Sequence, residues 1–437
     1  MAEGFEGLRR TFRGGKTRGI EWRKAQLRAV LRLLAENEAQ IFEALRLDLG
    51  KHPIGVVKKS ADHALVHISS WMAVKKAQLP LLLFPSKAQV LPEPLGIVLI
   101  FGSWNFPISL TLDPLIGAIS AGNTVLLELR WDKIFFTGSP RVGRIVMSAA
   151  AKHLTPVTLE LGGKCPVILD SFSGSDLQVA VKRIAGGKWG PCAGQACIGI
   201  DYVLVQKDLV PLLVNALTSC IKRFYGESAK NLNNICRIVN KNHYDRICNL
   251  LDEPGVAASI VYDGSMDSEN LVIGPTILVD PPLEAQIMTE EIFGPLLPII
   301  TLDKIEDSID FINERPKPLA IYAFTKNKKL KDRILQETSS GNVTFNDTII
   351  QFICDSLPFG GVGQSGFGRY HGKYSFDTFS HEKAVLHRSF FPELEPRYPP
   401  WNAFKLEFIR LAYNFDYVGL LLLLLGLRRI FTRNRSH

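Results

Sequence analysis

The sequence is poor in cysteine and lacks any apolar run long enough to cross a membrane. Its seven cysteines, spread over 437 residues, are odd in number, and none has the paired spacing of a zinc site. A disulfide framework and a metal site are therefore excluded, and a reducing compartment is indicated. The longest apolar run covers residues 417–427, whereas a bilayer-spanning helix needs about 20 residues, so a polytopic membrane protein is excluded too.

Charge of neither sign dominates the sequence. The 51 basic and 43 acidic residues give a formal net charge of +8, and no basic stripe alternates with aromatic residues. Nucleic acid is therefore not an expected partner. The chain also lacks a short repeat or a sustained heptad, which excludes a coiled coil, and it lacks the apolar segment of a secretory signal. With 46% hydrophobic residues, it is long enough for two or three globular domains.

Short apolar runs alternate with helical patterns along the chain. The apolar runs predict strands that are buried on both faces of a parallel sheet, at residues 96–101, 124–127, 133–136, 166–169 and 202–205. Apolar residues at helical spacing predict helices at residues 22–49, 110–120 and 141–152. This alternation of strands and helices indicates an α/β fold with a doubly wound sheet and crossover connections.

Three side chains in this pattern could serve one reaction. Cys197, in the segment Gly194-Gln-Ala-Cys197, could be a nucleophile if nearby dipoles or cations favour its thiolate. Glu160 lies among apolar residues at the end of a predicted strand, where burial would suit a water-activating base. Asn105 follows the first predicted strand at the carboxyl edge of the sheet, where its amide could donate to an oxyanion. The alternatives are an inert buried cysteine, an exposed acid and a turn asparagine.

A glycine-containing turn joins the strand 133–136 to the helix after it. Gly138 and Ser139 stand in this turn, in the segment Phe136-Thr-Gly-Ser139. The N-terminus of the following helix could approach a pyrophosphate there. A plain strand-to-helix turn remains the alternative for this segment.

Six segments, in this order, resemble the aldehyde dehydrogenase superfamily, in particular the class 3 branch that includes fatty aldehyde dehydrogenase. They are Gly102-Ser-Trp-Asn-Phe-Pro107, Phe136-Thr-Gly-Ser139, Leu159-Glu-Leu-Gly-Gly163, Gly194-Gln-Ala-Cys197, Glu290-Glu-Ile-Phe-Gly-Pro295 and Pro358-Phe-Gly-Gly-Val-Gly363. The resemblance runs from about Leu8 to Tyr398. It implies an aldehyde dehydrogenase-like α/β fold with two Rossmann-like doubly wound sheets, and it implies a homodimer.

The resemblance also implies an activity and a role for each matching residue. The family oxidises aldehydes to acids, with NAD as the expected cofactor and NADP as the alternative, and this branch implies medium- to long-chain aliphatic aldehydes. Cys197 would be the nucleophile, with the oxyanion held by Asn105 and by the Cys197 backbone N–H. Glu160 would activate water. Glu291 would accept hydrogen bonds from the nicotinamide ribose, with the Phe293 ring beside it.

One part of the family pattern is missing. After Asn123-Thr-Val-Leu-Leu127 the family continues with a Lys-Pro-Ser-Glu motif, a helix and a strand, whereas here Glu128-Leu-Arg-Trp131 joins the two ends directly. Roughly fifty residues are absent, more than the about thirty of a minimal crossover unit. The strands 124–127 and 133–136 are expected to be parallel neighbours, and residues 128–132 are too few for the crossover of about a dozen residues that such neighbours need.

This gap leads to the hypothesis of a rearranged cofactor domain with weak or absent NAD binding, and it keeps two further functions open. The chain could be a cofactor-impaired thiol esterase that keeps Cys197 and Glu160 but transfers no hydride. It could also be an inactive subunit that dimerises with an intact homologue.

The C-terminal segment differs in character from the rest of the chain. The amphipathic stretch 404–413 and the apolar run 417–427 predict an interfacial helix, held at anionic lipid by the arginines that follow, with a core or dimer-packing helix as the alternative. We therefore expect a membrane-associated protein that faces the cytosol, at the endoplasmic reticulum for example, or otherwise a cytoplasmic one. The predicted division is a cofactor domain (1–158, lacking the crossover near 128–132), a catalytic domain (159–380), a connecting segment (381–403) and a membrane-association tail (404–437).

Overall fold

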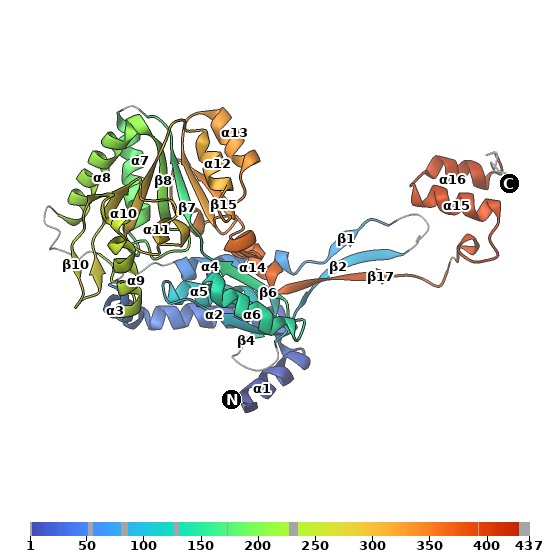
Figure 1. Cartoon of the computed structure of the whole chain (residues 1–437). Helices are drawn as coiled ribbons and strands as arrows, with labels where there is room; N and C mark the ends of the chain where they lie inside the picture. The colour runs from blue at the N-terminus through green and yellow to red at the C-terminus, as the bar shows by residue number, and fades with distance from the viewer. Residues whose placement is uncertain are drawn as a thin grey trace. The chain divides into compact units, whose positions relative to one another are not determined.

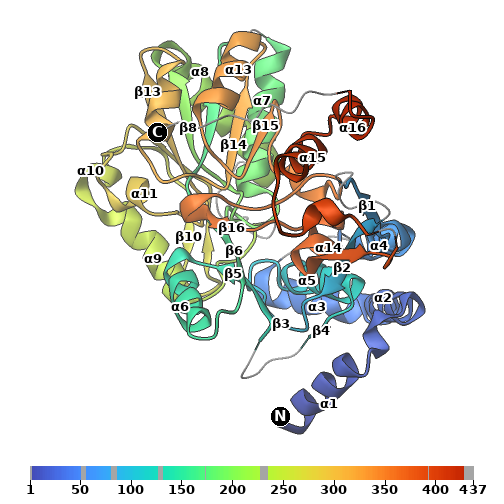
Figure 2. The same ribbon diagram turned by 90° about the vertical axis from the view of Figure 1, so that its right-hand side faces the viewer.

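The computed structural model describes residues 2–50, 56–79, 86–125, 131–172, 174–226, 235–391 and 393–427. The chain forms two compact units, one of Met1–Ile68 with Pro94–Phe379 and one of Ser69–Glu93 with Ser380–His437. Figures 1 and 2 show the elements of each unit from two sides. The first unit contains every residue to which the sequence assigns catalysis or cofactor binding, whereas the division into four functional segments stays a prediction.

The described residues form both helices and strands. The helices are α1 (Ala2–Arg13), α2 (Ile20–Glu36), α3 (Glu38–Leu49), α4 (Val56–Trp71), α5 (Pro107–Ala121), α6 (Pro140–Ala151), α7 (Ser175–Trp189), α8 (Val210–Tyr225), α9 (Lys241–Asp252), α10 (Pro254–Ala257), α11 (Gln286–Thr289), α12 (Asp307–Asn313), α13 (Lys328–Glu337), α14 (Gly372–Thr378), α15 (Ala403–Tyr413) and α16 (Tyr417–Leu424). The strands are β1 (Lys75–Ala77), β2 (Lys87–Pro94), β3 (Ile97–Phe101), β4 (Thr124–Val125), β5 (Lys133–Gly138), β6 (Val157–Leu161), β7 (Cys165–Leu169), β8 (Ile200–Gln206), β9 (Ile260–Tyr262), β10 (Met266–Asp267), β11 (Val272–Ile273), β12 (Thr276–Val279), β13 (Leu296–Leu302), β14 (Ala320–Phe324), β15 (Asn342–Phe345), β16 (Gly366–Phe367) and β17 (Ser380–His387).

The long helix predicted for residues 22–49 is two helices, α2 and α3. Asn37 separates them, because its side-chain amide and its backbone N–H both bond to the carbonyl of Leu33, at 2.8 and 3.2 Å. An asparagine side chain that competes in this way for helix carbonyls favours a helix end over a helix interior. The apolar spacing continues across the break, which is why the sequence pattern predicted one element.

The larger sheet has the order β15-β14-β7-β8-β13-β12-β9. All neighbours are parallel except β9, which pairs antiparallel with β12. Tyr202 and Leu204 of β8 join a core cluster with apolar side chains of α9, α11, α12 and α13. Val203 and Val205 alternate to the other face and are fully buried there. The predicted α/β fold is confirmed, with mixed rather than purely parallel sheets.

The smaller sheet has the order β16-β6-β5-β3-β4, with β16 antiparallel to β6 and the other pairs parallel. β3 therefore lies between β4 and β5, and the expectation that strands 124–127 and 133–136 are neighbours is wrong. Local sequence patterns predict a strand but not which strand it pairs with, which explains the error. Only Thr124–Val125 of the predicted strand 124–127 forms β4, and residues 126–130, including Glu128, lie outside the described residues.

The strand register shows how a short connection can join β4 to β5. Val98 of β3 pairs with Val125 on one side and with Lys133 on the other, so β4 ends at the level where β5 begins. Asp132 is bound at this level, because its N–H donates to the Ile97 carbonyl at 2.9 Å and its carboxylate accepts from the Ile97 N–H at 2.8 Å. The end of β4 and the start of β5 therefore lie at one level on either side of β3, about 10 Å apart at the usual strand spacing.

The second unit contains a three-stranded sheet of order β1-β2-β17 and a helical hairpin, α15 and α16. The two helices pack together through Phe408, Leu411, Ala412, Leu420 and Leu423. Among the described residues, no helix is both long and apolar enough to cross a membrane.

Candidate active site

Cys197 lies in the loop between α7 and β8, and this loop packs closely against the segment Glu290–Pro295. Gly194 has φ +78°, and a Cβ at this position would lie 2.1 Å from the carbonyl oxygen of Gly294. The loop conformation and this contact both require glycine at position 194. The carbonyl of Cys197 accepts a hydrogen bond from the Cys165 thiol of β7, with a sulfur–oxygen distance of 3.4 Å. The loop that carries Cys197, the predicted nucleophile, is therefore tied both to the larger sheet and to the Glu290–Pro295 segment.

Asn105 reaches the same loop from the smaller sheet. It follows β3, is 3% exposed, and donates from Nδ2 to the Gln195 carbonyl at 3.0 Å. Gln195 in turn bonds the loop to the chain beyond it: its amide donates to the carbonyls of Cys192 (3.1 Å) and Arg237 (2.9 Å). The structure thus places the Asn105 amide two residues from Cys197 along a loop whose shape is fixed by hydrogen bonds.

Glu160 stands on β6 and is 3% exposed. Neither of its carboxylate oxygens has a hydrogen-bond partner among the described residues. Burial raises its pKa well above the ordinary value, because the charged form loses its hydration without gaining a partner. A carboxyl group of this kind readily accepts a proton, which is what a general base requires.

The pKa of Cys197 connects the thiol to both carboxyl groups of the site. Burial raises this pKa above the ordinary thiol value, and the negative charges of Glu291 and Glu160 raise it further. Both carboxyls therefore lie within electrostatic reach of the thiol. The free thiol stays protonated at neutral pH, and it needs a base beside it to become a nucleophile.

The carboxylate of Glu291 sits directly against the strand-to-strand turn after Glu160. Its Oε1 accepts from the Gly163 N–H at 3.2 Å. A Cβ on Gly162 would lie 2.3 and 2.4 Å from the two carboxylate oxygens, so this close approach depends on glycine. Burial, and then the charge of Asp201, raise the pKa of Glu291 to about 8, although Lys164 and Arg246 act in the opposite direction.

Phe293 links the Glu290–Pro295 segment to Trp104, the residue before Asn105. Its backbone has φ +48°, an uncommon left-handed conformation for a bulky residue. Its ring meets Trp104 edge to face, with the ring centres 5.6 Å apart, and Trp104 also lies 5.4 Å from the His243 ring. Backbone strain of this kind is typical of functional sites, where the surrounding contacts enforce it.

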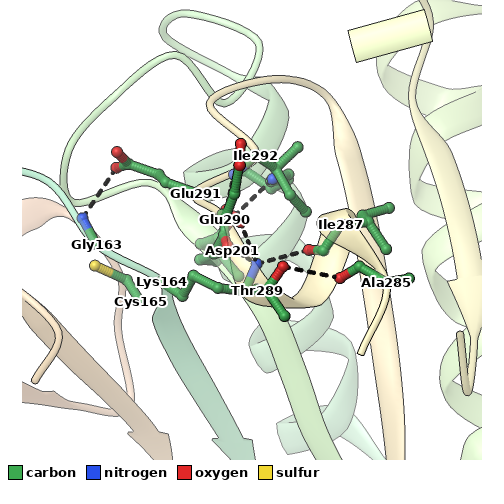
Figure 3. A network of polar contacts seen from close by, with 12 residues as sticks. Gly163, Lys164, Cys165, Asp201, Ala285, Ile287, Thr289, Glu290, Glu291 and Ile292 are labelled. Atoms are coloured by element: carbon green, nitrogen blue, oxygen red, sulfur yellow. Dashed lines mark hydrogen bonds and ion pairs between the residues drawn. The ribbon is translucent and has the colours of Figure 1, made fainter. Parts of the chain in front are cut away.

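A buried network of polar contacts holds the backbone around Glu291 (Figure 3). Lys164 forms an ion pair with Asp201, and it donates to the carbonyls of Ile287 (2.7 Å) and Glu290 (2.9 Å). The other oxygen of Asp201 accepts from the Ile292 N–H at 3.1 Å. Sequence reasoning missed this pair, and the available signal was a lysine directly after two glycines together with an aspartate inside an otherwise apolar strand.

Gly138 and Ser139 lie at the carboxyl end of β5, which pairs with the strand that carries Glu160. Gly138 pairs with Leu161, the residue after Glu160. Ser139 caps α6, because its hydroxyl accepts from the Val142 N–H at 3.4 Å. The predicted strand-to-helix turn is therefore present, and an ordinary turn would form the same cap, so pyrophosphate binding stays a prediction.

The arrangement can perform acyl chemistry on a thiol. The structure brings Cys197, Asn105 and Glu160 together from the two sheets, and it places Glu291 and Phe293 on a segment packed against the nucleophile loop. For a dinucleotide, the test of fit is the half-buried Glu291 carboxylate, which accepts one hydrogen bond from the described residues and has the capacity to accept further ones. The residues present fit the ribose end of such a cofactor.

Comparison with known proteins gives one consistent result. A profile of the "Aldehyde dehydrogenase family" matches residues 6–130 and 128–385. The chain is 53% identical to aldehyde dehydrogenase family 3 member F1 of Arabidopsis thaliana over 477 positions, which cover 98% of this chain and 99% of that one. Among solved structures, the substrate-bound state of Staphylococcus aureus AldH has a TM-score of 0.89 and 37% identity, covering 94% of this chain and 99% of the other.

Two more distant structures of the same fold contain a cofactor. Betaine aldehyde dehydrogenase of S. aureus, solved with NAD+, has a TM-score of 0.76 and 21% identity, with 90% of this chain and 87% of that chain covered. Glyceraldehyde-3-phosphate dehydrogenase GapN of Methanocaldococcus jannaschii, solved with NADP, has a TM-score of 0.77 and 21% identity, with 89% and 94% covered. Relatives of this fold therefore bind either nucleotide.

Proposed function

Because this chain belongs to the aldehyde dehydrogenase family, as an NAD(P)-dependent member of family 3, we propose that it oxidises medium- to long-chain aliphatic aldehydes through a covalent intermediate on Cys197. The observation that carries this proposal is the convergence of the Cys197 thiol with the Asn105 amide and the buried Glu160 carboxyl. The support for long substrates is the resemblance to the fatty aldehyde branch and the apolar C-terminal hairpin.

The first step is attack of the Cys197 sulfur on the aldehyde carbon. The thiol proton passes to the Glu160 carboxylate, the new carbon–sulfur bond forms, and the carbonyl π electrons move to the oxygen. The Asn105 amide and the Cys197 backbone N–H donate to this oxyanion, and one such donor is worth about 3 kcal/mol in comparable sites. Glu291 and Phe293 would hold the nicotinamide ribose end, with Gly138 and Ser139 near the pyrophosphate, and a nucleotide held there would supply the acceptor for the hydride of the substrate carbon.

The second step releases the acid. Loss of the hydride leaves a thioester on Cys197. Glu160 then releases the thiol proton to solvent, and the resulting carboxylate takes a proton from the water that attacks the thioester carbon. The carbon–sulfur bond then breaks, and the carboxylic acid leaves. Glu160 suits both proton transfers because its burial raises its pKa.

A cofactor-impaired thiol esterase is the second candidate. The alignment with the F1 relative covers 477 positions while this chain has 437 residues, so at least 40 positions have no residue here. The family profile matches in two pieces that meet at residues 128–130, next to the short strand β4. These observations support a missing segment in the cofactor domain, which would weaken nucleotide binding and leave the thiol chemistry.

One experiment separates these functions. The protein is mixed with NAD and a series of saturated aldehydes of increasing length, and the absorbance of reduced nicotinamide is followed in the wild type and in Cys197→Ala. Cysteine-dependent reduction that is fastest with the longer aldehydes supports the first proposal. Cysteine-dependent cleavage of a p-nitrophenyl ester without any NAD reduction supports the second. Absence of both activities would refute both proposals and favour the inactive subunit that pairs with an intact homologue.

The C-terminal hairpin supports a membrane-surface location on the cytosolic side, for example at the endoplasmic reticulum. The hairpin buries Leu420 and Leu423 but leaves an apolar face exposed. This face is formed by Val418, Leu421, Leu424, Leu425 and Leu427. An exposed apolar face of this kind suits shallow insertion between lipid head groups.

The test of this location is flotation with vesicles that contain anionic lipid. Full-length protein should float with the vesicles, and a chain lacking residues 404–437 should not. Leu421→Ser with Leu424→Ser should also abolish flotation, because it changes only the exposed face. Equal flotation of all three proteins would refute the anchor, and a change in the size of the homodimer would favour the dimer-packing alternative.

A further inference from the structure

The ammonium group of Lys164 donates all of its hydrogen bonds within the network around Glu291. It has three N–H donors, and its three partners are the Asp201 carboxylate and the carbonyls of Ile287 and Glu290. The side chains of Lys164 and Asp201 are only 11% and 4% exposed. Burying two charges is costly unless every donor and acceptor has a hydrogen-bond partner. Here the partners of the pair are mainly backbone groups of residues 287–292.

This segment is held on both sides of Glu291. Lys164 binds the carbonyl just before Glu291, and Asp201 binds the N–H of Ile292 just after it. Arg246 of α9 adds bonds to the carbonyls of Glu291 (3.5 Å) and Ile292. The backbone on either side of Glu291 is therefore fixed by charged side chains, while its carboxylate remains directed at Gly163.

The two members of the pair belong to the chain segments that carry the reaction. Lys164 lies four residues after Glu160, and Asp201 lies four residues after Cys197. The pair thus connects the chain that follows Glu160, the chain that follows Cys197 and the backbone of residues 287–292. Figure 3 shows Lys164 and Asp201 beside Glu290, Glu291 and Ile292.

The geometry points to Lys164 and Asp201 as a positioning pair, which fixes the Glu291 carboxylate and with it the ribose end of the cofactor relative to Cys197. This inference rests on the cofactor role proposed for Glu291. The pair makes no contact with substrate and acts through the backbone of residues 287–292. Removing Lys164 should free this backbone, leave Asp201 buried without its partner, and weaken nucleotide binding more than thiol chemistry.

The test uses the full-length chain with Lys164→Met and with the milder Asp201→Asn, which keeps an acceptor for the Ile292 N–H. Arg23→Met is the matched control. Arg23 is also a buried cation that binds carbonyls, those of Thr17 (3.0 Å) and Ser120 (2.9 Å), but it lies at the far end of α5 from Asn105. Three readouts are compared: hydrogen exchange of amides 288–293, the Kd for NAD by calorimetry, and Cys197-dependent cleavage of a p-nitrophenyl ester without nucleotide.

Lys164→Met should speed exchange of amides 288–293 and raise the Kd for NAD, each by about tenfold or more, because misplacement of a positioning group by about 1 Å can cost up to about a hundredfold. Ester cleavage should stay within about threefold of the wild type, and Asp201→Asn should change all values in the same direction by less. Arg23→Met should lower the melting temperature without changing the ratio of NAD affinity to ester cleavage.

Two results would overturn the inference. One is unchanged exchange and unchanged NAD affinity in a folded Lys164→Met variant. The other is ester cleavage that falls in proportion to NAD affinity, which would indicate a general structural role. If the wild type itself binds no NAD, the proposed oxidation fails, and hydrogen exchange of residues 288–293 still decides whether the pair holds this segment. If Lys164→Met does not fold, Asp201→Asn carries the same comparison.

Discussion

A single methyl group added at Gly162 should displace the Glu291 carboxylate, for which we propose a role in cofactor binding, and leave the thiol chemistry intact. A Cβ at this position would lie 2.3 and 2.4 Å from the carboxylate oxygens of Glu291. Ordinary non-bonded contacts need about 3.5 Å, so Gly162→Ala should displace the carboxylate by about 1 Å. The end of a side chain moves more readily than the backbone, and the fold should therefore survive while the Gly163–Glu291 hydrogen bond of 3.2 Å is lost.

The expected size of the effect follows from the bond that Glu291 would make to the ribose. A hydrogen bond to a charged group contributes about 1.5–3 kcal/mol, which corresponds to an increase of about 10- to 150-fold in the Kd for NAD. The measurement is a calorimetric titration above the Glu291 pKa of about 8, so that the carboxylate is ionised in both proteins. Cleavage of a p-nitrophenyl ester by Cys197, followed in parallel, should be unchanged.

The neighbouring glycine provides the control. A Cβ on Gly163 would meet its nearest atom, the Cα of Pro318, at 3.6 Å, an ordinary contact. Neither glycine has a positive φ, so alanine fits the backbone at both positions. Gly163→Ala should therefore bind NAD like the wild type. Equal NAD affinity in Gly162→Ala and the wild type would refute the close approach of Glu291 to Gly162. Equal weakening of NAD binding by both alanine substitutions would show that displacement of the Glu291 carboxylate is not the cause.

The remaining predictions concern the carboxyl groups, the oxyanion donor and a buried acid on α5. Burial raises the pKa of Glu291 to about 8 and that of Glu160 well above its ordinary value, so NAD-dependent turnover should rise between about pH 7 and pH 9, and a flat profile would contradict this. Asn105→Ala should lower kcat by about a hundredfold with an unchanged circular dichroism spectrum, and a smaller loss than tenfold would exclude an oxyanion role. Burial also raises the pKa of Asp113 from 3.8 to about 7. Between pH 3.8 and about pH 7 the folded state therefore binds more protons than the unfolded state, and the free energy of unfolding falls with rising pH by up to about 4 kcal/mol. Asp113→Asn should therefore raise the melting temperature at about pH 8 and much less near pH 4; an equal gain at both would contradict the burial penalty.

The sequence predicted the strands and turns that carry the candidate site residues because the signals for these elements are local. A glycine-rich turn, a strand end and a helix start are each encoded within a few residues, and the structure has Asn105 after β3, Ser139 at the start of α6 and Glu160 on β6. The strand order was not predictable in this way. Which strands pair depends on the faces that helices cover and on contacts across the whole chain, and β3 came to lie between β4 and β5.

The contacts that hold the site together could not be predicted from the sequence either. The sequence indicated Gln195 only as part of the segment that ends at Cys197. In the structure its backbone carbonyl accepts the hydrogen bond from Asn105, and its side-chain amide donates to the Cys192 carbonyl and so fixes the loop. Lys164 and Asp201 are 37 positions apart, and no periodic pattern joins them. Interactions of this kind become visible only when the two sheets are brought together.

The strand register distinguishes the two sides of β3, one facing β4 and the other facing β5 and Glu160. On the side of β3 that faces β4, pairing stops at Val98, and the described residues offer no partner on that side for the last three residues of the strand, up to the 37% exposed Phe101. On the other side, β5 continues at full length, and its Gly138 lies beside Leu161, next to Glu160. The proposed loss of a segment would therefore fall on the outer edge of the smaller sheet, on the side of β3 that faces β4, while β5 and β6, the strand that carries Glu160, keep their pairing. Hydride transfer should consequently suffer far more than ester cleavage at Cys197, and the ratio of the two activities measures how much of the cofactor site remains.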